Sequence, residues 1–324
     1  MVNPVSKAIV SVSAWDPGYG TNLDFKDFGD SDSVEIDDSV EYIARDWRGI
    51  ETALPSDPLD IFFIDGIQRI EARLEIFAEN DVVPRSALLG AVGAGVVHWD
   101  RRLMKSRFKE LLHRRLVVLP VGVTPETLGS LDSSLLPFEI RHSKGSDFTD
   151  LQDAMQKQMS ELEVSLAKSI DYEPGSLVIA DGRVRRDHPV FVVGYIKSNE
   201  RQYLSGKPAE VVPEIKLGQR TPIFRIEGSF PRFSWYIRVG DISGGHGWQG
   251  IARLEVSAEL SMDEVASYAA MTTEYLPIAA PPLHLDPRAP QNLIPIGALE
   301  RELRRGLGDA ELVNRKLREA VYMR

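Results

Sequence analysis

The chain of 324 residues contains no cysteine. This absence excludes a disulfide scaffold, a thiolate metal site and a cysteine nucleophile, and it suits a reducing cytoplasm. Long apolar runs are missing as well, since no stretch approaches the roughly 18 consecutive apolar residues of a membrane span. The N-terminus does not read as a signal peptide, because its short apolar run is broken by serine and followed by Asp16. We therefore expect a cytoplasmic protein with no membrane contact.

Positive charge is also scarce. Lysine and arginine number 38 against 48 acidic residues, which gives a formal net charge of −10. Binding to phosphates needs lysine and arginine, so this balance argues against a stand-alone nucleic-acid binder. It leaves open a nuclease with a deep acidic metal site and local basic rims, and it suggests that a partner delivers the polyanion.

A phosphate-binding loop of the ATPase type is absent too. The glycine-rich stretch GDISGGHGWQG, 240–250, lacks the Gly-Lys-Ser/Thr ending and is not followed by a helix. We interpret it as a flexible link between two strands. The chain is therefore not expected to hydrolyse ATP itself, which fits dependence on an external motor.

Two apolar segments stand out because each ends in Asp-Gly. The segments IFFID, 61–65, and SLVIADG, 176–182, are predicted as buried strands. Alternating apolar and charged residues over 69–77 predict a half-solvated strand, joined to the first by a tight turn at Gly66. A third strand is predicted over 87–99. Three sequential strands with short links would form an antiparallel meander.

The remaining pattern predicts helices on a mixed sheet. Apolar residues at spacings of three and four predict a long helix over 147–169. Ser261 and Glu264 form a capping box that opens a helix over 261–276. Strands are predicted at 190–198 and between 221 and 256, and a final helix is split near Gly306 to Gly308. The predicted class is α/β, a mixed sheet flanked by helices with additional β segments.

The chain divides into an acidic N-terminal segment, 1–59, and a single domain, 60–324. The run at 24–38 carries seven acidic residues against one lysine. It is either a solvated loop or edge element, or a docking segment for a basic partner. The basic segment at 100–116 predicts a helix, or a strand followed by a helix, within a helical insertion at about 100–146. Its charged face is either solvated or in contact with nucleic acid.

The two aspartates offer metal chemistry. Asp65 and Asp181 each end an apolar strand, and two such ends in one sheet can be neighbours. Paired carboxylates on an apolar floor repel each other unless a proton or cation lies between them. Mg²⁺ and Mn²⁺ prefer oxygen ligands, and the glycine after each aspartate permits close approach. The competing interpretation is two ordinary turns, which Asp-Gly also favours.

Further site residues are expected near these aspartates. A third carboxylate should come from the long helix, where Glu161 and Glu163 are the candidates. Glu163 is preferred because it flanks the apolar stripe beside the small Ala167, whereas Glu161 is expected in solvent. Lys197 ends an apolar strand and either contacts a phosphate as a point charge or is an ordinary strand-end lysine.

Several segments after residue 60 carry a family resemblance. They are FFIDG (62–66), LEVSLAKSIDYEPGSLVIADGRV (162–184), VFVVGYIKS (190–198), SWYIRV (234–239), GIARLEV (250–256) and APQNLIPIGALERELRRGLGD (289–309). In this order and spacing, the chain resembles the NurA family of DNA-end-processing nucleases, particularly bacterial members. A strand meander, a helix and a strand ending in aspartate is also the order found in ribonuclease-H-like nucleases.

The resemblance implies a ribonuclease-H-like core and Mn²⁺- or Mg²⁺-dependent cleavage of DNA. It further implies single-strand endonuclease and 5′–3′ exonuclease activity in end resection and DNA repair, by a homodimer working with a HerA-like hexameric ATPase. Asp65 and Asp181 correspond to the strand ligands and Glu163 to the helix carboxylate. Lys197 and Arg69 are expected to contact the DNA backbone.

The chain departs from the family near its C-terminus. The family pattern has a histidine there, and this sequence has Asn292 at roughly that place. Asp286 is then expected to complete the metal shell, or Asn292 to orient the substrate. The preferred mechanism is two-metal hydrolysis of a phosphodiester. Two alternatives stay open: a non-catalytic scaffold that binds a motor or DNA, and a phosphatase or nucleotidyl hydrolase that uses the same carboxylates.

Overall fold

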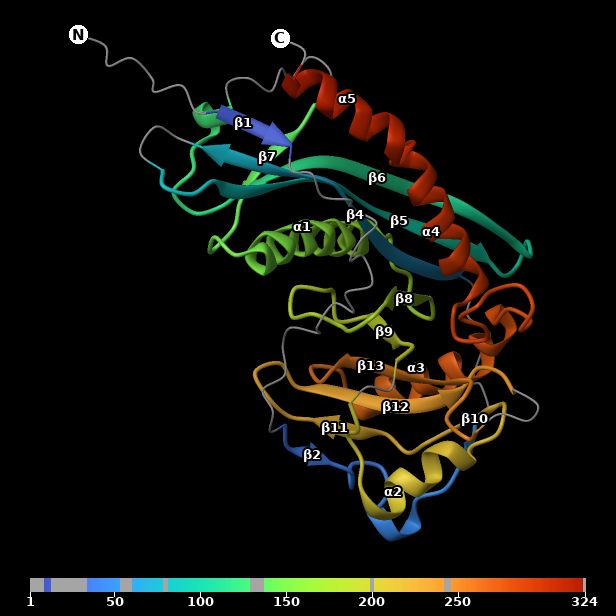
Figure 1. Cartoon of the computed structure of the whole chain (residues 1–324). Helices are drawn as coiled ribbons and strands as arrows, with labels where there is room; N and C mark the ends of the chain where they lie inside the picture. Colours follow the sequence, from blue (N-terminus) through green and yellow to red (C-terminus); the bar gives the residue numbers. More distant parts are fainter. Residues whose placement is uncertain are drawn as a thin grey trace.

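The computed structural model describes residues 9–12, 34–52, 60–77, 81–128, 137–198, 201–241 and 246–322. Within these ranges thirteen strands form one mixed sheet whose main path runs β2-β11-β12-β13-β9-β8-β4-β5-β6-β7. The strands β1, β3 and β10 pair beside this path. Helices pack on both faces of the sheet (Figure 1). The class is therefore α/β, as predicted.

Three long antiparallel strands dominate one half of the sheet. They are β4 (Asp60–Phe77), β5 (Arg85–Asp100) and β6 (Lys105–Leu119). β8 (Leu177–Asp181) pairs in parallel with β4, and β9 (Val192–Ile196) pairs in parallel with β8. Helix α1 (Phe148–Ser169) lies between β6 and β8 in the chain. These strands lie side by side in the order β6-β5-β4-β8-β9. Along the chain, a strand meander is followed by a helix and by a strand that ends in aspartate, as the sequence predicted.

The other half of the sheet continues from β9 through antiparallel pairs. Its main strands are β13 (Ile251–Ser257), β12 (Arg232–Arg238) and β11 (Phe224–Ile226). The short strands are β10 (Gln219–Arg220), β2 (Ile36–Asp37) and β3 (Ile50–Glu51). Two strands lie at other edges: β1 (Ile9–Val12) pairs with β4, and β7 (Glu139–His142) pairs with β6.

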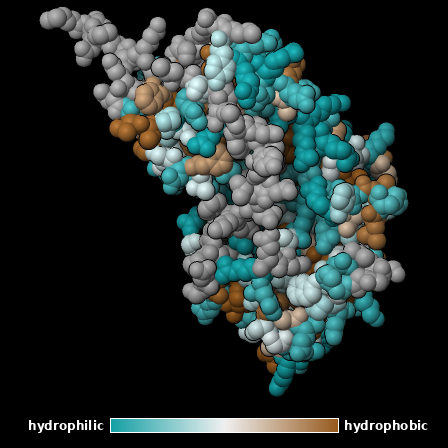
Figure 2. All heavy atoms as spheres, in the orientation of Figure 1, coloured by the Kyte–Doolittle hydropathy of each residue, from teal (hydrophilic) through white to brown (hydrophobic). Residues whose placement is uncertain are grey.

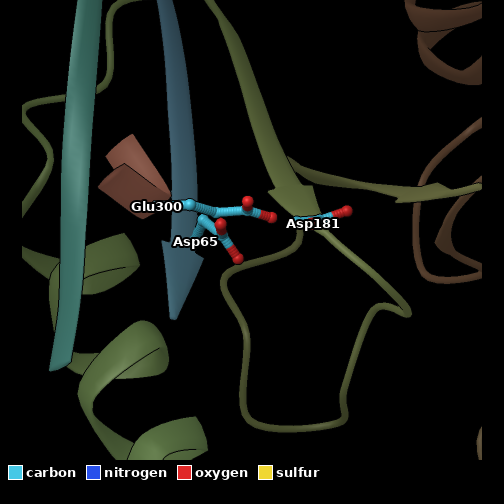
Figure 3. Close-up of side chains that lie close together, drawn as sticks. All are labelled: Asp65, Asp181 and Glu300. Atoms are coloured by element: carbon cyan, nitrogen blue, oxygen red, sulfur yellow. The ribbon is translucent and has the colours of Figure 1, made fainter. Parts of the chain in front are cut away.

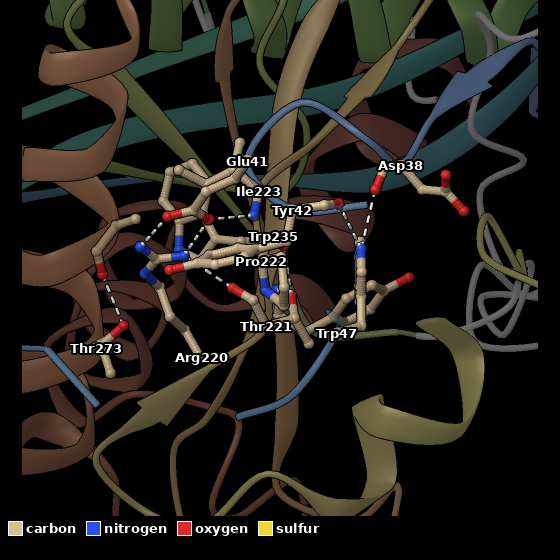
Figure 4. Close-up of polar contacts among 12 residues, drawn as sticks. Asp38, Glu41, Tyr42, Trp47, Arg220, Thr221, Pro222, Ile223, Trp235 and Thr273 are labelled. Atoms are coloured by element: carbon tan, nitrogen blue, oxygen red, sulfur yellow. Dashed lines mark hydrogen bonds and ion pairs between the residues drawn. The ribbon is translucent and has the colours of Figure 1, made fainter. Parts of the chain in front are cut away.

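Residues 34–52 of the acidic N-terminal segment pack against this second half as an edge element. Glu41 accepts two hydrogen bonds from the Arg220 guanidinium, at 2.7 and 2.8 Å, and one from the Ile223 backbone N–H at 2.8 Å (Figure 4). Trp47 is buried, and its indole N–H donates to the Asp38 carbonyl. Most of the acidic run at 24–38 lies outside the described residues.

Alternation along β4 determines which helix covers each of its side chains. Phe62 and Ile64 join the cluster formed with α1, whereas Ile61, Phe63 and Ile67 join the cluster on the opposite face. That opposite face carries α3 (Met262–Tyr275) and α4 (Ile294–Gly306), while α5 (Ala310–Tyr322) covers the far end of β4 (Figure 1). Odd-numbered positions near residue 65 therefore face α4, because successive strand residues point to opposite faces.

The surface reflects the acidic, polar composition. The face drawn in Figure 2 is mainly hydrophilic, and its hydrophobic residues form small separate patches. The helix over 147–169, the capping box at Ser261 and the break in the last helix at Gly308 agree with the sequence predictions. None of the helices in the described ranges has the length and apolarity that crossing a membrane requires.

The tight turn predicted at Gly66 is wrong. β4 runs without interruption through this residue, and Gly66 pairs with Ala94 in the middle of the ladder with β5. A Cβ atom on Gly66 would lie 2.8 Å from Glu163 Oε1 and 2.9 Å from Met159 Cγ. The glycine therefore serves the close approach of α1 to the sheet, and the long partner strand overrides the local turn tendency of Asp-Gly.

The helical insertion predicted at about 100–146 is also wrong for the described residues. Residues 105–119 form strand β6, 139–142 form β7, and only 125–128 form a short 3₁₀ helix. β6 pairs with β5 over nearly its whole length and buries Leu116 to Leu119. The long edge of β5 needs backbone partners, and this requirement outweighs the helix tendency of a lysine- and arginine-rich segment.

The packing of α1 on Gly66 generates a prediction for stability. Gly66→Ala should lower the free energy of unfolding by about 1–3 kcal/mol, because the new methyl overlaps Glu163 and Met159 and the helix must move. Urea unfolding followed by circular dichroism measures the change. Unfolding at the wild-type midpoint would show that α1 does not pack this closely.

Candidate metal centre

Three carboxylates from distant parts of the chain converge between the sheet and α4. Asp65 lies within β4, Asp181 ends β8 and Glu300 comes from α4 (Figure 3). One oxygen of each lies within 4.8 Å of the others. Asp65 and Glu300 are buried and Asp181 is half-buried. Within the described ranges this is the group of acidic side chains whose geometry suits a metal ion.

Strand pairing brings the two aspartates together. β4 and β8 are parallel and pair Ile64 with Ala180, so Asp65 and Asp181 occupy the next position on each strand. Both side chains point to the face covered by α4, because they alternate with Ile64 and Ala180 on the α1 face. Asp65 is not at a strand tip as predicted, since β4 continues to Phe77 while β8 ends at Asp181.

Glu300 is a site residue that the sequence reasoning missed. It belongs to the buried face of α4, four residues after Ile296 and three before Leu303, both fully buried. A carboxylate at this spacing within an apolar stripe was the available signal. Arg288 donates to both Glu300 oxygens, at 3.0 and 2.5 Å, which orients the carboxylate.

Asp65 combines deep burial with an incomplete set of hydrogen bonds. Asp65 is 5% exposed, and its Oδ1 accepts a hydrogen bond from the Gly66 backbone N–H at 2.8 Å. Oδ2 is buried and has no hydrogen-bond partner. Burial, together with the neighbouring Asp181 carboxylate, raises the pKa of Asp65 well above its usual value. Such an atom is costly to bury unless a proton or cation binds it.

Lys197 is the nearest cation to Asp181. Its Nζ lies 2.6 Å from Asp181 Oδ2 and 2.9 Å from Asn292 Oδ1. Burial raises the pKa of Asp181, and the Lys197 ammonium opposes this increase. Lys197 and Asn292, both expected at the site, therefore lie beside the cluster. Their roles toward a substrate stay predictions.

Asp286 lies outside the three converging carboxylates. Its Oδ2 accepts from Asn292 Nδ2 at 2.8 Å, and its Oδ1 accepts from the Arg288 backbone N–H at 2.7 Å. Although burial opposes it, these hydrogen bonds hold the pKa of Asp286 below its usual value. Both oxygens of Asp286 already have protein donors, so its expected role as a metal ligand stays a prediction with no geometric support of its own.

Glu163 approaches from the α1 face, at Gly66, rather than from the face that carries the cluster. It is 6% exposed, and its Oε2 lies 3.6 Å from Arg185 Nη2. Burial raises its pKa to about 7; Arg185 opposes the increase and Asp181 adds to it. The charge of Asp181 thus affects the pKa of Glu163 across the sheet. The role of Glu163 as a metal ligand stays a prediction.

Arg69 is engaged at the far end of α4. Its guanidinium donates to Glu71 Oε1 at 2.7 Å and to the carbonyls of Leu307 and Gly308, at 3.1 and 2.8 Å. Glu71 is buried, so this pair fastens the C-terminal end of α4 to β4. Contact of Arg69 with a substrate stays a prediction.

Solved structures of similar fold exist. No protein-family model matches the sequence, and no curated protein matches it. The fold is similar to that in the "Crystal structure of the NurA nuclease from Sulfolobus solfataricus", with a TM-score of 0.49 and 11% sequence identity. The alignment covers 86% of this chain and 90% of that chain. The site residues named above follow from the geometry of this chain alone.

The burial of Glu163 predicts a pH-dependent stability. Its folded pKa of about 7 lies above the ordinary 4.5, so the folded state retains the proton longer than the unfolded chain. Stability should therefore fall as the pH rises from about 4.5 to 7. Glu163→Gln removes this penalty and should stabilise the protein at pH 8 by up to about 3 kcal/mol, with the gain vanishing near pH 4.5.

Urea unfolding in EDTA at the two pH values measures this effect. Glu161→Gln is the matched control, because Glu161 lies on the same helix with its side chain 47% exposed beside Lys157. The control should show no such pH-dependent gain. An equal gain for Glu163→Gln at both pH values would contradict the prediction.

Proposed function

We propose that this protein is a metal-dependent nuclease that hydrolyses phosphodiester bonds in DNA. The observation that carries the proposal is the convergence of Asp65, Asp181 and Glu300, with a buried and unpartnered oxygen on Asp65. Carboxylate sites with nearby cations are suited to phosphoryl chemistry, because both the ion and the phosphate need charge compensation. The sequence resemblance to NurA nucleases supports the same conclusion.

The residues present fit a hard divalent cation. Three carboxylates form an all-oxygen donor set, which Mg²⁺ and Mn²⁺ prefer. Asp65 Oδ2 has a free lone pair and no protein donor to satisfy it. Asp65, Asp181 and Glu300 would hold the ion, and an ion bound there supplies Lewis-acid polarisation of the phosphate and a lowered pKa for water.

The chain's own groups account for the rest of the site. Lys197 places an ammonium beside Asp181, where it can attract and orient a phosphate as a point charge. Arg288 orients Glu300 and adds a second positive charge at the same edge. Glu163, with a pKa near 7, can exchange a proton at neutral pH from the other side of Gly66.

The finer features of the proposal come from the resemblance to NurA nucleases. They are the preference for DNA and Mn²⁺, the combination of single-strand endonuclease and 5′–3′ exonuclease activity, the homodimer and the HerA-like hexameric ATPase. The net charge of −10 supports dependence on a partner, because the chain has little positive charge with which to gather DNA alone.

The direct test is cleavage of labelled single-stranded DNA in Mn²⁺ by the wild type and by Asp65→Asn and Glu300→Gln. Each substitution should lower the rate on the order of 100-fold or more, because each removes a carboxylate from the donor set. Glu302→Gln is the matched control, since Glu302 lies on the same helix and pairs with Arg305. It should cleave at the wild-type rate.

The outcomes separate the alternatives. Undiminished cleavage by Asp65→Asn would reject the assigned site. Release of phosphate from a small monoester, with DNA left intact, would favour a phosphatase. Absence of cleavage even with a cognate hexameric ATPase present would favour a non-catalytic scaffold.

A further inference from the structure

A continuous chain of hydrogen bonds connects two of the three carboxylates on their outer side. It begins where Lys197 Nζ donates to Asp181 Oδ2 at 2.6 Å and to Asn292 Oδ1 at 2.9 Å. Asn292 Nδ2 donates to Asp286 Oδ2 at 2.8 Å. The two ends of the Asn292 amide therefore face groups of opposite charge.

The chain continues from Asp286 to Glu300. The Arg288 backbone N–H donates to Asp286 Oδ1 at 2.7 Å, and the Arg288 guanidinium donates to both oxygens of Glu300. Asp181 and Glu300 are thus joined through two cations and a central amide–carboxylate pair. Neither Asn292 nor Asp286 contributes an oxygen to the converging carboxylates.

Asparagine is the residue type that this position requires. Asn292 is 1% exposed, so its amide has little access to water. An amide offers an acceptor to the lysine and a donor to the aspartate at the same time. An alanine would leave both neighbours unsatisfied, and an aspartate would set two carboxylates against each other.

The segment that carries the amide is itself fixed. The Asn292 backbone N–H donates to the Arg288 carbonyl at 3.0 Å. The hydroxyl of the buried Tyr195 donates to the neighbouring Gln291 carbonyl at 2.7 Å. Tyr195 lies on β9, opposite Asp181 in the parallel ladder. The position of the Asn292 amide is therefore fixed relative to β8, the strand that carries Asp181.

We propose that Asn292 and Asp286 are positioning residues that hold Lys197 and Arg288 at the site for the substrate phosphate. The inference rests on the proposed nuclease function. Once a cation neutralises Asp181 and Glu300, these carboxylates attract Lys197 and Arg288 less strongly. A lysine that is held less strongly regains side-chain entropy by moving into solvent, and the hydrogen bond to Asn292 opposes that movement.

This assignment differs from a metal-ligand role for Asp286 and from direct substrate contact by Asn292. It also differs from a purely structural role, in which the chain only fastens residues 286–293 to the sheet. The positioning role and these three alternatives predict different effects on Mn²⁺ affinity, on DNA affinity and on melting temperature.

A reciprocal exchange of the two side chains tests the proposal. Asn292→Asp places two carboxylates in the present 2.8 Å contact, and Asp286→Asn sets two donors against each other or loses the bond from Arg288. The double variant N292D/D286N restores every donor–acceptor pair and leaves the net charge unchanged. The three variants and the wild type form a double-mutant cycle.

The cycle is measured with three readouts. They are Mn²⁺ affinity by calorimetry, affinity for a single-stranded oligonucleotide in Ca²⁺ by fluorescence anisotropy, and kcat and KM for DNA cleavage in Mn²⁺. Each single variant should bind Mn²⁺ within about 3-fold of the wild type but lose about 10- to 100-fold in kcat/KM, with weaker oligonucleotide binding. The double variant should regain most of both losses.

Other results overturn the inference in recognisable ways. Loss of Mn²⁺ affinity beyond 10-fold in Asp286→Asn, not regained in the double variant, would make Asp286 a metal ligand. Lower melting temperatures with unchanged kcat and KM per folded molecule would leave only a structural role. If the wild type cleaves DNA and each single variant cleaves it at the same rate, the positioning role is also rejected.

Failure of the proposed function is distinguishable from failure of the inference. A wild type that cleaves no DNA would count against the nuclease. The oligonucleotide affinities would still test whether Asn292 and Asp286 position the two cations. A wild type that does not bind the oligonucleotide at all would reject the inference as well.

Discussion

The parallel pairing of β4 with β8 is the constraint on which the site depends. Its register puts Asp65 and Asp181 side by side on one face, beneath α4. A buried and a half-buried carboxylate this close together repel each other, and burial already disfavours their charged forms. Two cations at the edge of the site offset this repulsion: Lys197 forms an ion pair with Asp181, and Arg288 forms one with Glu300. Strand pairing thus concentrates negative charge, and the surrounding segments compensate it in part.

The site has an inner and an outer layer with opposite hydrogen-bonding character. Inside, Asp65 retains a buried oxygen with no donor. Outside, both oxygens of Asp286 and both ends of the Asn292 amide are occupied. Donors saturate the side chains that need a fixed orientation, and the lone pair left open belongs to the buried Asp65. This division is what a site for a divalent ion and an anionic substrate requires.

The second half of the sheet stabilises the chain that leaves the site. Glu255 on β13 is fully buried, accepts from the Val184 backbone N–H at 2.9 Å and pairs with Arg253 at 2.6 Å. Val184 lies three residues after Asp181, so this buried ion pair fixes the path of the segment beyond β8. Arg232 also lies 3.6 Å from Glu255, so removing Glu255 would take the carboxylate away from two buried guanidiniums, which couples the site to the far strands.

The sequence by itself determined the features that depend on near neighbours: the apolar strands that precede Asp65 and Asp181, the long helix α1, and the capping box at Ser261. The turn predicted at Gly66 and the helix predicted within 105–119 were wrong. In both places pairing with the long strand β5 outweighed the local preference of the residues. Only the tertiary structure revealed Glu300 beside the aspartates. A helix pattern shows that one face is buried, but the opposing partner depends on strand register and helix packing between segments far apart in the chain.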